Sequence, residues 1–371
     1  MIHPTWIEID LDQFRENLKL IRQGIGKARF CLPVKANAYG HGTVSIAKAA
    51  QSSGVVDCLA VSCLQEGVKL KEAGIQIPIL VLGAIHEDQI EDLSKYELEF
   101  SISSLFKAQA VSKIIKKKRV PVHIEVETGM QRSGSRPKTC LKLAEYIRSQ
   151  PCFDLIGVYS HFATADSPSN PFAKSQMEQF RNLIQHPLFQ GLIAHMANSS
   201  GVVHYPESHF DMVRPGLMAY GYPPQGAGPP FDRVAPCFSL KSKVAYFKVV
   251  GPNQGVGYGH TYVTSKETRI VTVPIGYGDG YRRALSNLGF VLIRGKRFKI
   301  AGTICMDQFM VDVGDAESYV GDEVVLIGKQ GEEEIPLSEI AQACHTIPYE
   351  ILSQFNERIP RVFLSSQSAL V

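Results

Sequence analysis

The sequence predicts an α/β protein that combines an N-terminal (β/α)8 barrel of the TIM type with a mainly β C-terminal domain. In the first part of the chain, short apolar runs alternate with longer helical segments. A Gly- and Pro-rich segment then occupies residues 223–236, and the apolar runs after it are short and separated by turns. We therefore expect domains at residues 1–232 and 233–371, and we allow the first residues to pack on the C-terminal domain.

A first helix is predicted to begin near Asp10, whose carboxylate suits an N-cap, because Leu11, Phe14, Leu18 and Ile21 follow at helical spacing. The barrel prediction depends on the apolar runs after this helix. Parallel strands need crossover connections, and the intervals between the runs are long enough to be helices. The eight predicted strands are residues 30–34, 58–62, 77–82, 98–102, 120–126, 155–160, 192–197 and 210–213, with helices expected at 43–52, 65–73 and 176–185 among others.

The C-terminal domain is predicted to be a β domain with one late helix around residues 337–344. Its expected strands are residues 238–250, 268–273, 290–293, 309–313 and 323–327.

Composition excludes several functional classes. With 371 residues, 44% hydrophobic and 20% charged, the chain has the composition of a soluble globular enzyme. A formal charge of +3 is too small to indicate a nucleic-acid or membrane partner. We find no secretory signal and no C-x-x-C pair among the eight cysteines, so we expect a cytoplasmic protein with reduced thiols. The eleven histidines show no H-x-x-x-H or H-x-H spacing, and no metal site is expected.

Polar residues whose side chains are suited to catalysis or ligand binding follow the predicted barrel strands. Active sites of such barrels lie at the carboxyl ends of the strands, so these residues are expected to converge on one face. They are Lys35 after the first strand, Arg132 after the fifth, His161 after the sixth, Asn198 and Ser199 after the seventh, and Arg214 after the eighth. A lysine at such a position is held by its backbone and free at its tip, as a Schiff-base lysine must be.

Three segments carry a resemblance to a known family. The string Pro33-Val-Lys-Ala-Asn-Ala-Tyr-Gly-His-Gly42 closely resembles the pyridoxal-phosphate attachment motif of alanine racemases, which are fold-type III isomerases. Residues 256–262 and 305–308 resemble the family's catalytic tyrosine motif and a segment contributed across its dimer interface. The resemblance implies racemisation of L- and D-alanine through a Schiff base on Lys35, supply of D-alanine for peptidoglycan, and a homodimer with shared active sites.

The resemblance also implies the cofactor contacts. Arg214 would face the pyridine nitrogen and weaken the ring as an electron sink, because an arginine does not readily give up its proton. His161 would pack against the ring. The phosphate contacts would be Tyr39, Ser199, Gly216, Leu217 and Tyr349, and barrels of this kind often bind phosphate on the loops after the seventh and eighth strands.

Racemisation needs a base on each face of the reacting carbon. The resemblance assigns these roles to Lys35 and Tyr258. A free tyrosine has a pKa of about 10, so a tyrosine that acts as a base at pH 7 needs positive neighbours that stabilise its phenolate by roughly 4 kcal/mol. His195 and Arg214 match the residues linked to this tyrosine in the family.

The substrate contacts implied by the resemblance include a departure from the family pattern. Arg132 and the backbone N–H of Met306 would bind the substrate carboxylate. Many relatives have a carbamylated lysine where this chain has Glu125, and we hypothesise that Glu125 takes over its role of orienting Arg132. Residues matching supporting or entrance positions are Asp166, Tyr277 and Asp307.

Three other functions remain open from the sequence. A non-catalytic cofactor-binding barrel would lack the long second domain with Tyr258 and Met306. An amino-acid decarboxylase of the same fold would generally pair the pyridine nitrogen with a carboxylate, which counts against it because Arg214 occupies that position. A racemase for serine or a broader set of amino acids is not distinguished by sequence, because pocket width depends on packing.

Overall fold

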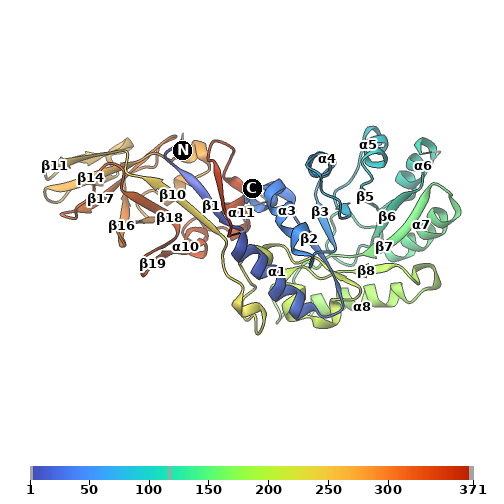
Figure 1. The fold of residues 1–371 in the computed structure, drawn as a ribbon. Helices are drawn as coiled ribbons and strands as arrows, with labels where there is room; N and C mark the ends of the chain where they lie inside the picture. Colours follow the sequence, from blue (N-terminus) through green and yellow to red (C-terminus); the bar gives the residue numbers. More distant parts are fainter. Residues whose placement is uncertain (1–2, 116–117, 367–371) are drawn as a thin grey trace.

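The computed structural model describes residues 3–115 and 118–366. Figure 1 shows two bodies side by side, a barrel with helices around it and a β domain that contains both the first and the last strand of the chain. The predicted fold class is therefore confirmed. Within the described ranges, every helix is too short or too polar to pass through a lipid bilayer.

Eight parallel strands close the barrel, and β9 pairs with β2 to complete it. Most of their residues are buried, as expected for strands covered on both faces. The last strand is shorter than the predicted run 210–213, because Phe210 has a φ of +46° and is not extended. The strands are β2 Arg29–Pro33, β3 Cys58–Val61, β4 Ile79–Val81, β5 Glu99–Ile102, β6 Val120–Glu125, β7 Phe153–Tyr159, β8 Ile193–His195 and β9 Met212–Val213.

The helices of the barrel half begin with α1, whose N-cap is Asp10 as predicted. The Asp10 carboxylate accepts hydrogen bonds from the backbone N–H groups of Asp12 and Gln13 at 3.0 and 2.9 Å. The helices are α1 Leu11–Ile25, α2 Lys35–Tyr39, α3 Thr43–Ser53, α4 Leu64–Glu72, α5 Ile90–Lys95, α6 Leu105–Ile114, α7 Pro137–Ser149, α8 Phe172–Ile184 and α9 Ser199–His204.

The second domain is built on one large sheet with the strand order β11-β14-β17-β16-β15-β18-β10-β1-β20. Two short strands, β12 and β13, form a separate ribbon, and β19 pairs with β18. The strands are β1 Trp6–Asp10, β10 Phe238–Lys243, β11 Tyr246–Val250, β12 Gly255–Val256, β13 Tyr262–Val263, β14 Thr268–Val273, β15 Phe290–Ile293, β16 Lys296–Ala301, β17 Phe309–Gly314, β18 Glu323–Gln330, β19 Glu333–Ile335 and β20 Arg361–Leu364.

Two expectations for this domain were wrong, and several strands were not predicted. The run 238–250 is two strands, because β10 pairs with β1 and β18 whereas β11 pairs with β14. Two late helices are present where one was expected, α10 Leu337–Ala343 and α11 Pro348–Gln354. Strands β1, β12, β13, β16, β19 and β20 were not predicted. Strand β1 pairs with β10 and with β20, so residues 6–10 lie in this sheet. The division at residues 232 and 233 remains a prediction.

Candidate active site

Lys35 leaves the barrel directly after β2 through an unusual turn. The next four residues, Ala36 to Tyr39, have φ values of 51°, 54°, 53° and 52°, so α2 is a left-handed turn. Left-handed backbone costs about 1–2 kcal/mol per non-glycine residue. Neighbouring groups hold the turn in place, because Glu66 accepts from the N–H of Ala36 at 2.6 Å and Asn37 accepts from the N–H of Thr43 at 3.0 Å. Strain of this kind is often located at functional sites.

The side chain of Lys35 lies in a cavity of about 370 Å³ at the carboxyl ends of the strands. Arg132, Tyr159, His161 and Arg214 also line this cavity. Burial, together with the positive charges of Arg132 and Arg214, lowers the pKa of Lys35. The barrel therefore brings three predicted residues, Arg132, His161 and Arg214, together around the Lys35 amine, which is neutral more often than that of a surface lysine.

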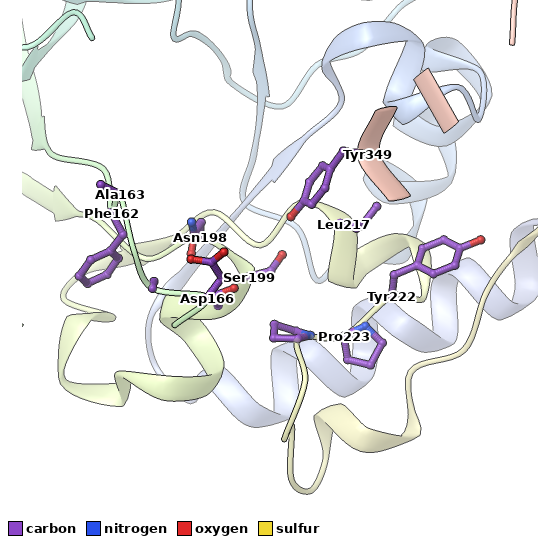
Figure 2. A pocket seen from close by; sticks show the side chains of 12 residues that line it. Phe162, Ala163, Asp166, Asn198, Ser199, Leu217, Tyr222, Pro223 and Tyr349 are labelled. Carbon is purple, nitrogen blue, oxygen red and sulfur yellow. The ribbon is translucent and has the colours of Figure 1, made fainter. Parts of the chain in front are cut away.

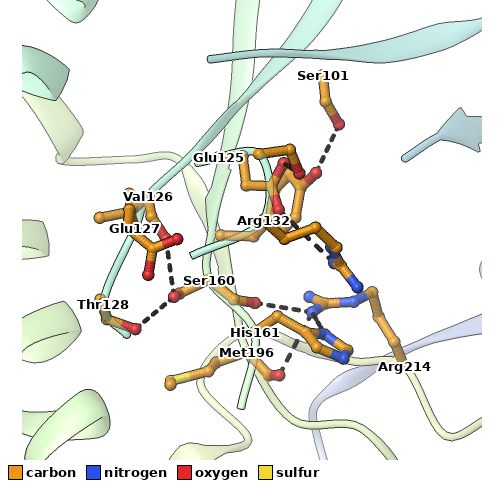
Figure 3. A network of polar contacts seen from close by, with 12 residues as sticks. Ser101, Glu125, Val126, Glu127, Thr128, Arg132, Ser160, His161, Met196 and Arg214 are labelled. Atoms are coloured by element: carbon orange, nitrogen blue, oxygen red, sulfur yellow. Dashed lines mark hydrogen bonds and ion pairs between the residues drawn. The ribbon is translucent and has the colours of Figure 1, made fainter. Parts of the chain in front are cut away.

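Arg214 is buried at the floor of this site and donates to several acceptors (Figure 3). Its N–H groups contact Nδ1 of His195, the carbonyl oxygen of Ser160 at 2.8 Å and Nδ1 of His161 at 3.2 Å. Because a guanidinium can only donate, Nδ1 of both histidines must be the acceptor. Burial and the charge of Arg214 hold the pKa of His161 and of His195 well below the usual value, which agrees with neutral rings.

We expect the protein to lose stability as the pH falls from 6 to 5. Burial lowers the pKa of His41 to about 4, and the pKa values of His161 and His195 are lowered in the same way. The unfolded chain takes up protons below pH 6.5 that these folded histidines do not bind, so the free energy of unfolding should fall by about 1.4 kcal/mol per pH unit for each histidine. Denaturant unfolding at pH 7, 6 and 5 measures the slope. Equal stability at the three values would contradict it.

A second cavity of about 300 Å³ lies beside the loops that follow β8 and β9. Figure 2 shows Ser199, Leu217, Asp166 and Tyr349 around it. Burial and the charge of Asp166 raise the pKa of Tyr349, which therefore keeps its hydroxyl proton at neutral pH. These residues include three of the five predicted phosphate contacts.

The other two predicted phosphate contacts, Tyr39 and Gly216, lie against each other. A Cβ atom added to Gly216 would lie 2.6 Å from the hydroxyl oxygen of Tyr39, so only glycine lets this tyrosine approach the loop. The ring centre of Tyr39 is 5.9 Å from that of Tyr349. The turn that carries Lys35 therefore also places a hydroxyl group next to the polar cavity.

Glu125 and Arg132 form an ion pair, with 3.7 Å between Oε1 and Nη2. The side chain of Glu125 is 6% exposed and that of Arg132 is 50% exposed. The hydroxyl of Ser133 donates to Oε2 of Glu125 at 2.7 Å. A buried, hydrogen-bonded carboxylate thus lies behind a half-exposed guanidinium, in the arrangement that the hypothesis for Glu125 requires.

The structure does not bring Tyr258 and Met306 to Lys35 within one chain. Both lie in the second domain and line an open cavity of about 620 Å³ with Asp307. Tyr258 is 72% exposed and Met306 is 53% exposed. Tyr277 lies near this segment, and its N–H donates to the carbonyl of Cys305 at 3.1 Å.

The expected link from His195 to Tyr258 is also not made within the chain. Both ring nitrogens of His195 are in use, Nδ1 by Arg214 and Nε2 by His123 at 3.0 Å. His161 uses Nδ1 for Arg214, and among the described residues no partner accepts from its Nε2. His161 is therefore the better placed of the two histidines to contact a group that enters the Lys35 cavity.

Several polar residues of this region were missed from the sequence. Glu66 lies in the first turn of its helix, just after a barrel strand, so the rule that identified Lys35 could have identified it. Glu99 and His123 lie inside the barrel strands β5 and β6. The only feature of the sequence that could have identified them is a charged or polar side chain within an otherwise apolar strand.

The fold and the site define a class of (β/α)8-barrel proteins in which a partly buried lysine follows a barrel strand and a second, polar cavity is lined by the loops after β8 and β9. Residues 9–224 and 237–363 match the family models described as alanine racemase N-terminal and C-terminal domains. The alanine racemase of Carboxydothermus hydrogenoformans is 41% identical over 370 residues, which cover 98% of this chain and 100% of that protein.

Solved structures agree with this match. That of alanine racemase from Streptomyces lavendulae superposes with a TM-score of 0.93 at 34% identity and covers 99% of this chain and 98% of its own. That of alanine racemase from Bacillus anthracis with bound L-Ala-P superposes with a TM-score of 0.92 at 34% identity, covering 99% and 96%. The chain belongs to the alanine racemase family, as the sequence motifs implied.

Proposed function

We propose that this protein interconverts L- and D-alanine with pyridoxal phosphate held on Lys35, in a homodimer whose two subunits share each site. The main support for the proposal is that Lys35 and Arg214 line one cavity, while Ser199 and Tyr349 line a second, polar cavity at the same end of the barrel. A role in supplying D-alanine for peptidoglycan is what membership of the family suggests.

The residues present fit the cofactor. Lys35 supplies an amine of lowered pKa for the aldehyde, and the hydroxyls of Tyr39, Ser199 and Tyr349 can hold the phosphate. The absence of a side chain at Gly216 leaves the loop open next to the Tyr39 hydroxyl. When bound, pyridoxal phosphate withdraws electrons from the α carbon of an amino acid and makes the α proton removable.

Arg214 would limit this electron withdrawal by facing the pyridine nitrogen, as the family resemblance implies. A guanidinium only donates, so a ring nitrogen that faces Arg214 remains an acceptor and is not protonated by it. This supports proton transfer at the α carbon and disfavours reactions that need a stronger electron sink. The same observation counts against the decarboxylase alternative.

Two side chains would move the α proton. Lys35 serves one face of the α carbon, and Tyr258 of the partner subunit serves the other. A partner is needed because Tyr258 and Met306 are exposed and line a separate cavity in their own chain. In this arrangement the Nε2–H of His161, which lines the Lys35 cavity, would donate to the incoming tyrosine.

The proposal is tested by incubating L-alanine with the purified protein and pyridoxal phosphate in heavy water. We expect the α-proton NMR signal to disappear while D-alanine forms. Cofactor binding without α-proton exchange would refute the proposal that alanine is the substrate. The same assay with L-serine and other amino acids decides between an alanine racemase and a broader one.

We expect Glu125→Gln to reduce kcat/KM for alanine about tenfold, since the ion pair between Glu125 and Arg132 loses its negative charge. The glutamine keeps the size of the side chain but removes the charge that faces Arg132. Steady-state kinetics measures the loss. Glu127→Gln is the matched control, because Glu127 lies two residues away and accepts from Gly129 without contacting Arg132. Equal kinetics for the two variants would show that Glu125 does not orient Arg132.

A further inference from the structure

Four polar side chains form a line across the interior of the barrel, from Glu99 at the start of β5 to Arg214 after β9. Oε2 of Glu99 is 3.2 Å from Nε2 of His123. Nδ1 of His123 is 3.0 Å from Nε2 of His195, and Nδ1 of His195 contacts Arg214. The line joins the amino end of the barrel strands to the floor of the Lys35 cavity.

The two ends of this line fix the direction of every hydrogen bond in it. Arg214 can only donate, so Nδ1 of His195 accepts and the proton of a neutral His195 is on Nε2. This N–H then donates to Nδ1 of His123, so the proton of a neutral His123 is on its own Nε2. The carboxylate of Glu99 accepts from that position. Both imidazole tautomers are therefore determined by the charged groups at the ends.

The barrel is shaped to hold the two rings. His123 is 1% exposed, and a Cβ atom added to Gly157 on β7 would lie 2.1 Å from its Nδ1, so glycine is needed there. The pairing of β6 with β7 shifts register between Val122 and His123. Tyr159 stacks on His195, with 4.9 Å between ring centres and 11° between planes.

We propose that Glu99 and His123 are positioning residues for Arg214. They act through His195, by keeping its Nδ1 free of a proton and thus available to the guanidinium. With the other tautomer, an N–H of His195 would oppose an N–H of Arg214 and displace the guanidinium from its position over Tyr159, where 5.1 Å now separates its central carbon from the ring centre. The effect on catalysis rests on the function proposed above. The assignment of the two histidine tautomers does not depend on that function.

The test uses Glu99→Leu, which removes the acceptor at similar size, and Glu99→Gln, which keeps an oxygen acceptor. The control is Glu97→Leu, because Glu97 is close in sequence but exposed and paired with Lys118 at 2.7 Å. Long-range ¹H–¹⁵N spectra of the cofactor-loaded protein report which nitrogen of each imidazole carries the proton. Thermal unfolding of all variants checks that they are folded.

We expect wild type to show His123 and His195 protonated on Nε2 only, and Glu99→Leu to show mixed tautomers. We also expect kcat for alanine to fall about tenfold in Glu99→Leu with KM nearly unchanged, because Arg132 and not Arg214 holds the carboxylate. Glu99→Gln should recover most of both properties. Wild-type tautomers in Glu99→Leu, or kinetics equal to those of Glu97→Leu, would overturn the proposal. A wild type that does not racemise alanine refutes the function proposed above, and the spectra still decide the tautomers.

Discussion

Mixing Lys35→Ala with Tyr258→Phe should restore racemisation that neither variant has alone. Loss of a positioned proton-transfer group typically costs 10²–10⁴-fold, and we expect about 10³-fold for Tyr258→Phe. Lys35→Ala loses both the attachment point and a base. In a mixed dimer, one site has both substitutions and the other has neither. With random exchange, half of the dimers are mixed, so about a quarter of wild-type activity should return.

The control for this experiment is a mixture of Lys35→Ala with the double variant Lys35→Ala/Tyr258→Phe. No dimer in that mixture contains an intact site, so its activity should stay at the level of the single variants. Subunit exchange is followed by mass with one variant tagged. If exchange is complete and the first mixture remains inactive, each site is formed by one chain and the shared-site proposal is wrong.

Gly216→Ala should weaken binding of pyridoxal phosphate by more than tenfold. The new Cβ would lie 2.6 Å from the hydroxyl oxygen and 3.2 Å from the Cζ atom of Tyr39, so the tyrosine must leave the loop. A displaced phosphate contact of this kind is worth about 1.5–3 kcal/mol when the ligand is charged. Titration of the cofactor-free protein, followed by absorbance, measures the affinity.

Gly228→Ala is the matched control for this substitution. Gly228 lies in the Gly- and Pro-rich segment 223–236, and a Cβ atom there meets nothing within 4 Å in the described part of the chain. Its affinity for pyridoxal phosphate should equal that of wild type. Unchanged affinity in Gly216→Ala would show that the phosphate does not bind between this loop and Tyr39.

Much of the barrel could be predicted because its strands are buried on both faces and read as continuous apolar runs. The second domain was harder, since its outer strands are short or polar. Strand β16, for example, begins with exposed residues, and β1 and β20 pair although they are at opposite ends of the chain. No local pattern indicates a pairing between such distant segments.

The site could be predicted where one rule sufficed, namely that active-site residues follow the carboxyl ends of the barrel strands. Lys35, Arg132, His161, Ser199 and Arg214 follow strands of a parallel barrel, and the structure brings them to one end. The side chains of Glu99 and His123 could not be found in this way, because their contacts depend on how the barrel closes. The proposed approach of Tyr258 to Lys35 of a partner subunit lies beyond any rule for a single chain.

The left-handed turn after Lys35 has a consequence for the order of events during protein synthesis. A Cβ atom added to Gly40, at its end, would lie 2.1 Å from the carbonyl oxygen of Leu352 in α11, and Nε of Arg361 in β20 donates to the carbonyl of Gly40 at 3.2 Å. Chains fold as they emerge from the ribosome, N-terminal part first. The contacts around the lysine segment are therefore complete only after α11 and β20 have emerged. A prematurely terminated chain keeps the hydrogen bonds of this turn to Glu66 and within residues 37–43 but lacks the contacts with Leu352 and Arg361.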